Sequence, residues 1–103
     1  MNDGALEPDD CTTMAEVRIG VDTVDEALCE LLGKRFAYMQ AAARIKTERS
    51  QVRDEARKTQ VIENVRLAAA LNGWPAELAA NLWERLVEAS IAYELERWDD
   101  AHR

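Results

Sequence analysis

Residues 14–46 read MAEVRIGVDTVDEALCELLGKRFAYMQAAARIK, and this stretch decides the fold. Its apolar residues recur at steps that alternate between three and four, and one arginine takes a place in the series: Met14, Val17, Val21, Val24, Leu28, Leu31, Arg35, Tyr38, Ala42 and Ile45. Such a heptad seam is typical of a helix that packs along its length against another helix. No proline interrupts the seam, and its phase continues past Gly20 and Gly33. The pattern therefore predicts one long helix.

The start of this helix is marked by Thr13 and Glu16, which have the spacing of a capping box. A helix over residues 13–47 would be roughly 50 Å long at 1.5 Å per residue. A compact chain of this size has a radius of gyration of only about 13 Å. Because so short a chain cannot cover the whole helix, we expect a second copy to cover the rest, in an intertwined homodimeric helical bundle.

Two further helices are predicted after the long one. The second runs from about Val52 to Leu71 and is stopped by Asn72-Gly73, and the third runs from Pro75 to Trp98. The third carries an apolar stripe at helical spacing: Leu78, Leu82, Leu86, Ala89 or Ser90, Tyr93 or Glu94, and Trp98. We therefore predict an all-α domain over residues 13–103, with three helices per chain, preceded by a flexible N-terminal tail over residues 1–12.

The composition excludes several classes of protein. The chain has 103 residues, a net charge of −7, two cysteines and one histidine. The negative charge argues against binding to nucleic acid or to an anionic membrane surface. No run of residues is apolar enough to span a membrane, and the acidic N-terminus does not resemble a secretory signal, so we expect a cytoplasmic protein. Too few Cys and His are present for an ordinary zinc site, and we predict no metal and no cofactor.

Charge is unevenly distributed along the chain. Residues 34–66 hold nine bases and four acids, whereas the segments on either side are acidic. Within this basic part, Arg35 occupies a seam position, and Lys46 follows three turns later on nearly the same face. A guanidinium in an apolar seam requires an anion. Either a small anionic ligand supplies that anion, or Arg35 pairs with an acid such as Glu88 or Glu94 while the Lys46 ammonium reaches solvent.

Four more polar residues lie on or beside the apolar faces of the second and third helices: Asp54, Arg57, Ser90 and Glu94. Each has a purely structural alternative. Asp54 and Arg57 can form a surface pair, Ser90 can bond to the preceding helical turn, and Glu94 can form a salt bridge across the bundle. Taken together, these residues and the two cations can line a cavity for a small, rigid polyanion. The three tryptophans are interpreted as packing residues.

The chain resembles the all-helical chorismate mutase family, which includes isochorismate pyruvate lyases, over about residues 10–101. The matching segments are residues 14–46 as quoted above, VRDEARK (52–58) and LWERLVEASIAYELERW (82–98). The resemblance implies three helices per chain, with two chains intertwined through the long first helix. It also implies that the substrate is a cyclohexadiene dicarboxylate that carries an enolpyruvyl ether.

The resemblance also implies a role for each residue of the site. Arg18 reaches into the partner's site and holds a carboxylate, and Arg35 holds a carboxylate in its own chain's site. Lys46 contacts the ether oxygen and a carboxylate. Asp54 contacts the ring hydroxyl, and Arg57 supports a carboxylate. Ser90 lies beside the hydroxyl or a carboxylate, and Glu94 lies near the ether oxygen.

Rearrangement of chorismate to prephenate is pericyclic, so it requires neither a nucleophile nor a cofactor. The resemblance therefore implies that the protein holds a chair-like geometry and stabilises charge as the C–O bond breaks, with Lys46, Arg35 and Glu94 as the catalytic groups. Glu94 can donate a hydrogen bond to the ether oxygen only when it is protonated. We therefore expect activity to fall as pH rises, and Glu94→Gln to flatten the pH profile.

Other functions are compatible with the same residues. Asp10-Cys11-Thr12 and Glu96-Arg97-Trp98 resemble the lyase branch, whereas Asp54 and Ser90 match the mutases. Lys58 stands where mutases often have Glu, which leaves open a mutase of the 4-amino analogue of chorismate. A mutase activated by a partner enzyme of the shikimate pathway, and a non-enzymatic helical dimerisation or regulatory module, are further alternatives. The main prediction is a chorismate mutase (an isomerase) of aromatic amino-acid biosynthesis.

Overall fold

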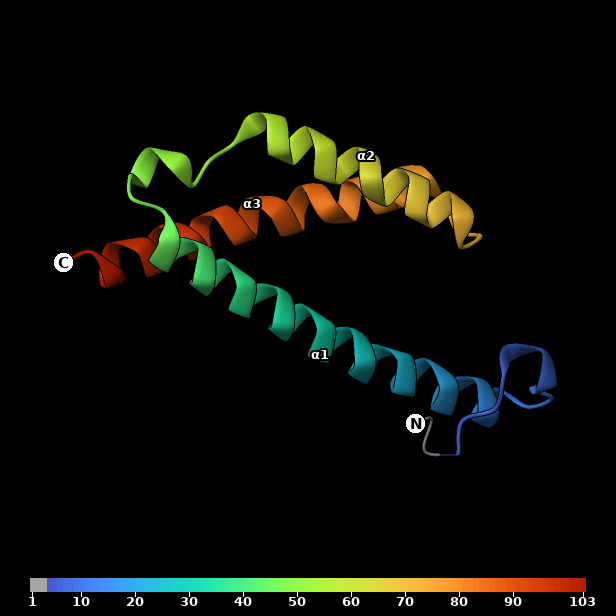
Figure 1. The fold of residues 1–103 in the computed structure, drawn as a ribbon. Coiled ribbons are helices and arrows are strands. Elements are labelled where there is room, and N and C mark those ends of the chain that lie inside the picture. Colours follow the sequence, from blue (N-terminus) through green and yellow to red (C-terminus); the bar gives the residue numbers. More distant parts are fainter. Residues whose placement is uncertain (1–3) are drawn as a thin grey trace. The chain divides into compact units, whose positions relative to one another are not determined.

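The computed structural model describes residues 4–103, and it is all-helical over that range. Its elements are η1 (Pro8–Asp10), α1 (Met14–Ile45), η2 (Arg49–Gln51), α2 (Glu55–Leu71) and α3 (Ala76–Ala101), of which η1 and η2 are single 3-10 turns (Figure 1). The prediction of three helices with a long first one is confirmed. None of the helices in this range is both long enough and apolar enough to cross a membrane.

Two compact units make up the chain, Met1–Ala37 and Tyr38–Arg103, and each is described by itself. In the first unit, α1 begins with the expected capping box, because Thr13 N donates to Glu16 Oε1 at 3.0 Å and Glu16 N donates to Thr13 Oγ1 at 3.2 Å. Backbone donation from Thr12 and Thr13 lowers the pKa of Glu16. The helix passes Gly20 and Gly33 without a break.

The segment before α1 is part of the predicted tail. Residues 8–10 form η1, which the sequence pattern did not predict, and the backbone of Leu6 passes close to Gly20 of α1. Residues 1–3 of the predicted tail lie outside the described part of the chain. The flexibility of residues 1–12 remains a prediction.

The second unit is built on the packing of α2 against α3, which run side by side in Figure 1. Val52, Val87 and Ile91 form its apolar centre, and four half-buried side chains pack around them: Val61, Trp83, Leu95 and Trp98. Two of the three tryptophans are therefore packing residues, as predicted. The other buried apolar positions hold alanines, namely Ala43, Ala69, Ala79 and Ala80.

Two details of the predicted helices are wrong. The second helix begins at Glu55 rather than at about Val52, because the Asp54 side chain caps the helix by accepting from Arg57 N at 3.0 Å. The buried face of α3 includes Ala79 and Ala80, whereas Leu78 and Leu82 from the predicted stripe are exposed. Close packing of α2 on α3 favours alanines at the contact, which leaves these leucines on another face.

Candidate active site

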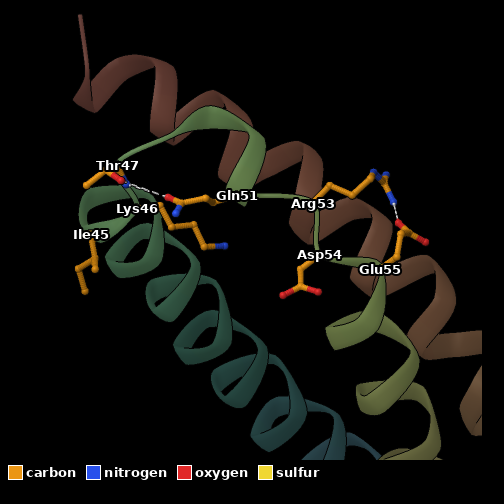
Figure 2. A pocket seen from close by; sticks show the side chains of 7 residues that line it. All are labelled: Ile45, Lys46, Thr47, Gln51, Arg53, Asp54 and Glu55. Atoms are coloured by element: carbon orange, nitrogen blue, oxygen red, sulfur yellow. Dashed lines mark hydrogen bonds and ion pairs between the residues drawn. The ribbon is translucent and has the colours of Figure 1, made fainter.

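A cavity of about 650 Å³ lies where α1 ends and α2 begins. It is lined by Ile45, Lys46, Thr47, Gln51, Arg53, Asp54 and Glu55. Figure 2 shows the side chains of Lys46 and Asp54 extending into the space between the two helices, while Arg53 extends away from it toward Glu55. The cavity therefore presents a cation from one helix end and a carboxylate from the other.

Two residues of α3 bind Lys46, one at its side chain and one at its backbone carbonyl. Its Nζ lies 2.8 Å from Oε2 of Glu94, whose side chain is only 5% exposed. Its carbonyl accepts a hydrogen bond from Nε1 of Trp98 at 3.0 Å. This carbonyl lies at the C-terminal end of α1, where backbone oxygens have no partner within the helix. A buried carboxylate and a fixed backbone carbonyl therefore determine where the ammonium lies. The salt bridge across the bundle that we considered as a structural role for Glu94 is thus present, with Lys46 as its partner.

Asp54 lies at the N-cap of α2. Its Oδ1 accepts from Arg57 N, and within residues 4–103 no hydrogen bond or ion pair reaches its second carboxylate oxygen. That oxygen can accept a hydrogen bond from a ligand hydroxyl in the cavity. We considered a surface ion pair between the side chains of Asp54 and Arg57. The structure instead has a hydrogen bond from the backbone N–H of Arg57 to the Asp54 carboxylate.

Arg57 does not line the cavity. Its Nη1 donates to Oε1 of Gln60 at 2.8 Å, one turn further along α2.

Ser90 is buried, and its Oγ donates to the carbonyl of Leu86 at 2.6 Å, which is the bond to the preceding turn that we considered as its structural role. Because a hydroxyl has one proton, Ser90 can only accept from a ligand in this arrangement. Arg18 and Arg35 belong to the first unit, where Arg18 is exposed and Arg35 half-buried.

The segment that joins α1 to α2 contains residues that sequence reasoning missed. Gln51 Oε1 accepts from the backbone N–H groups of Thr47 and Glu48, both at 3.0 Å, and Glu48 caps η2 in return. The signal that could have identified this turn is the spacing of Glu48 and Gln51, which is that of a capping box. Arg49 donates to Asp99 at 2.8 and 3.3 Å, and this pair lowers the pKa of Asp99 and raises that of Arg49.

The family model for chorismate mutase type II matches residues 17–95. The chain belongs to this family. Among curated proteins, the isochorismate pyruvate lyase of Pseudomonas aeruginosa is 28% identical to this chain over 91 residues, which cover 88% of this chain and 90% of that protein. The matched range runs from the first turn of α1 into α3 and includes all seven residues of the predicted site: Arg18, Arg35, Lys46, Asp54, Arg57, Ser90 and Glu94. Membership in a family named for a chorismate enzyme, together with similarity to a lyase, supports an enzymatic role.

Proposed function

We propose that this protein is a chorismate mutase that rearranges chorismate to prephenate. The observation that carries the proposal is that Lys46, which is ion-paired with the buried Glu94, and Asp54 line one cavity of a chorismate mutase type II chain. The pair supplies a positioned cation and a buried carboxyl group on neighbouring helices. The reaction needs no group that attacks the substrate, and the proposed site contains neither a Cys nor a His.

The chemistry assigned to each residue follows from its charge and place. The Lys46 ammonium donates to the ether oxygen, where negative charge develops as the C–O bond breaks and the new C–C bond forms within the same molecule. Glu94 holds Lys46 in the absence of substrate and donates to the ether oxygen when it is protonated. Asp54 accepts from the ring hydroxyl through its second oxygen. Arg35 binds a carboxylate, and Ser90 accepts from the hydroxyl. Arg57 binds a carboxylate once its side chain turns from Gln60 toward the substrate.

We infer that the active form is a homodimer in which Arg18 enters the partner's site. Support comes from the seam of α1, whose large apolar residues are exposed in the single chain; Leu31, for example, is 64% exposed. Within residues 4–103, four of the seven buried apolar residues are alanines, which gives a single chain little apolar area to bury. A second copy packed on the seam removes the leucines and valines from water.

The second candidate is isochorismate pyruvate lyase, which eliminates pyruvate from isochorismate and leaves salicylate. The similarity to the lyase of Pseudomonas aeruginosa favours it. Both reactions break the same kind of ether bond in an enolpyruvyl substrate, so a cation at the position of Lys46 serves either one. Groups that contact the ring discriminate between them, and Asp54 and Ser90 are the residues that favour the mutase.

The deciding experiment incubates the purified chain separately with chorismate and with isochorismate and identifies the products by chromatography and mass spectrometry. Prephenate from chorismate, with little salicylate from isochorismate, is the expected result. Efficient formation of salicylate would replace the mutase assignment with the lyase. Absence of product from both substrates would contradict both, and the 4-amino analogue of chorismate would be the next substrate to test.

A further inference from the structure

Three charged side chains, Arg53, Lys58 and Glu88, form a cluster between the start of α2 and the middle of α3, and Arg53 alone among them lines the cavity. Glu88 of α3 accepts two hydrogen bonds from Arg53, at 3.0 and 2.7 Å, and one from Lys58 at 2.8 Å. Lys58 donates a further bond to Glu84 at 3.0 Å, and its side chain is only 16% exposed. Glu88 is thus the acceptor that Arg53 and Lys58 share.

The two residues that Glu88 holds lie on either side of Asp54 in the chain. Arg53 precedes the N-cap, and Lys58 lies in the first turns of α2. Backbone bonds tie the intervening residues together, because Arg57 N donates to the Asp54 carboxylate and Lys58 N donates to the Asp54 carbonyl, both at 3.0 Å. A displacement of Arg53 or Lys58 from α3 therefore displaces Asp54 as well.

The cluster also explains the charge at position 58. The ammonium of Lys58 is bonded to two carboxylates of α3, and these carboxylates raise the pKa of Lys58. Both partners of the ammonium, Glu84 and Glu88, lie on α3, and Lys58 is absent from the cavity lining. The role of Lys58 is to connect α2 to α3.

We propose that Glu88 is a positioning residue that, by bridging Arg53 and Lys58, holds the first turn of α2 against α3 and keeps the Asp54 carboxylate in the cavity beside Lys46. This proposal rests on the proposed function, since it assigns Asp54 to the substrate. A bidentate arginine–carboxylate pair fixes orientation as well as distance, and a small displacement of a substrate-binding group lowers turnover strongly. The expected effect is therefore on catalysis more than on folding.

The first test compares Glu88→Gln with Glu77→Gln. Glu77 forms an ion pair with Arg66 at 3.1 Å, which also joins α3 to α2 but at the opposite end of the two helices. Glu88→Gln is expected to lower kcat/KM about tenfold and to speed amide hydrogen exchange at Arg57 and Lys58. Glu77→Gln should leave both quantities at the wild-type value. Equal effects of the two substitutions would overturn the proposal, because they would indicate a general loss of helix packing.

The second test asks whether Glu88 acts through Asp54. In an Asp54→Asn background, Glu88→Gln should cause no further loss of kcat/KM, since the group that it positions is already changed. Lys58→Met should behave like Glu88→Gln, and Lys58→Arg should retain most of the activity because it keeps a donor for Glu88. If the losses of kcat/KM from Asp54→Asn and Glu88→Gln are fully additive in free energy, Glu88 does not act through Asp54 and the proposal is wrong.

Amide exchange separates a failure of this proposal from a failure of the proposed function. It is measured without substrate, so it reports on the first turn of α2 whatever reaction the protein catalyses. If the wild-type chain converts neither chorismate nor isochorismate, the proposed function is wrong. If Glu88→Gln leaves amide exchange at Arg57 and Lys58 unchanged, the positioning role of Glu88 is wrong, whatever reaction the protein catalyses.

Discussion

Lys46 Nζ and Glu94 Oε2 lie 2.8 Å apart, although the two residues are 48 positions apart in the sequence. The pair joins the C-terminal end of α1 to a buried face of α3. A buried carboxylate that holds a cation fixes its position and is costly to leave without that cation. Both members of the pair are therefore informative targets for substitution.

Lys46→Ala is expected to lower kcat for chorismate at least about a hundredfold, because it removes the donor assigned to the developing charge on the ether oxygen. Far-UV circular dichroism should show that the helices persist. Measurement of prephenate formation at saturating substrate tests this prediction. Near-normal turnover would overturn the assignment of Lys46 to the reaction.

Glu94→Gln is expected to flatten the pH dependence of kcat. The amide of Gln donates a hydrogen bond at every pH, whereas the carboxyl group of Glu94 donates only when protonated. A loss of activity that is caused by ionisation of Glu94 should therefore be absent from the variant. An identical pH profile for the two proteins would exclude Glu94 as a donor to the substrate.

Hybrid dimers test whether Arg18 enters the partner's site. Arg18→Ala and Lys46→Ala chains should each be nearly inactive alone. When equal amounts are unfolded together and refolded, half of the dimers are mixed, and each mixed dimer contains one intact site. Recovery of about a quarter of the wild-type activity is the expected result. No recovery, in a mixture shown to contain mixed dimers, would place Arg18 and Lys46 in the same chain's site or remove Arg18 from the site.

Glu88 makes stability depend on pH in acid. Hydrogen bonds from Arg53 and Lys58 lower the pKa of Glu88 to about 2. The unfolded chain, in which this carboxyl has an ordinary pKa, therefore binds more protons than the folded chain between about pH 4.5 and pH 2. The stabilisation is present above this range and is lost as pH falls through it. Thermal unfolding should show that Glu88→Gln lowers Tm at neutral pH, and that the difference narrows toward pH 2; a constant difference would contradict this account.

Trp98→Phe is expected to destabilise the fold by about 1 kcal/mol, because the Lys46 carbonyl loses its donor while the aromatic packing is largely retained. Urea unfolding followed by circular dichroism measures the change. Trp74→Phe is the matched control, since Trp74 lies outside the apolar centre of the second unit. Equal stability of wild type and Trp98→Phe would show that the hydrogen bond from the indole N–H to the Lys46 carbonyl contributes nothing to the stability of the fold.

The long helix could be predicted closely from sequence. The seam and the capping box at Thr13 place it within residues 13–47, and the observed helix is Met14–Ile45. Helix starts and ends depend on interactions between residues three or four positions apart, which the sequence displays directly. The start of α2 was placed too early because Asp54 was interpreted as lying on the same side of the helix as its apolar residues. Asp is also a preferred N-cap residue, and the structure shows that Asp54 has this role.

The sequence by itself determined the helical class, the continuity of α1 and the family to which the chain belongs, because these depend on periodicity and on the order of residue types. Tertiary structure alone decided which charges meet. Glu88 and Glu94 were both considered as partners of Arg35, yet Glu94 binds Lys46, and Glu88 binds Arg53 and Lys58. Pairing between helices depends on how α3 is rotated and shifted against its neighbours, and that geometry is set by the alanines and valines packed between the helices rather than by the charged residues themselves.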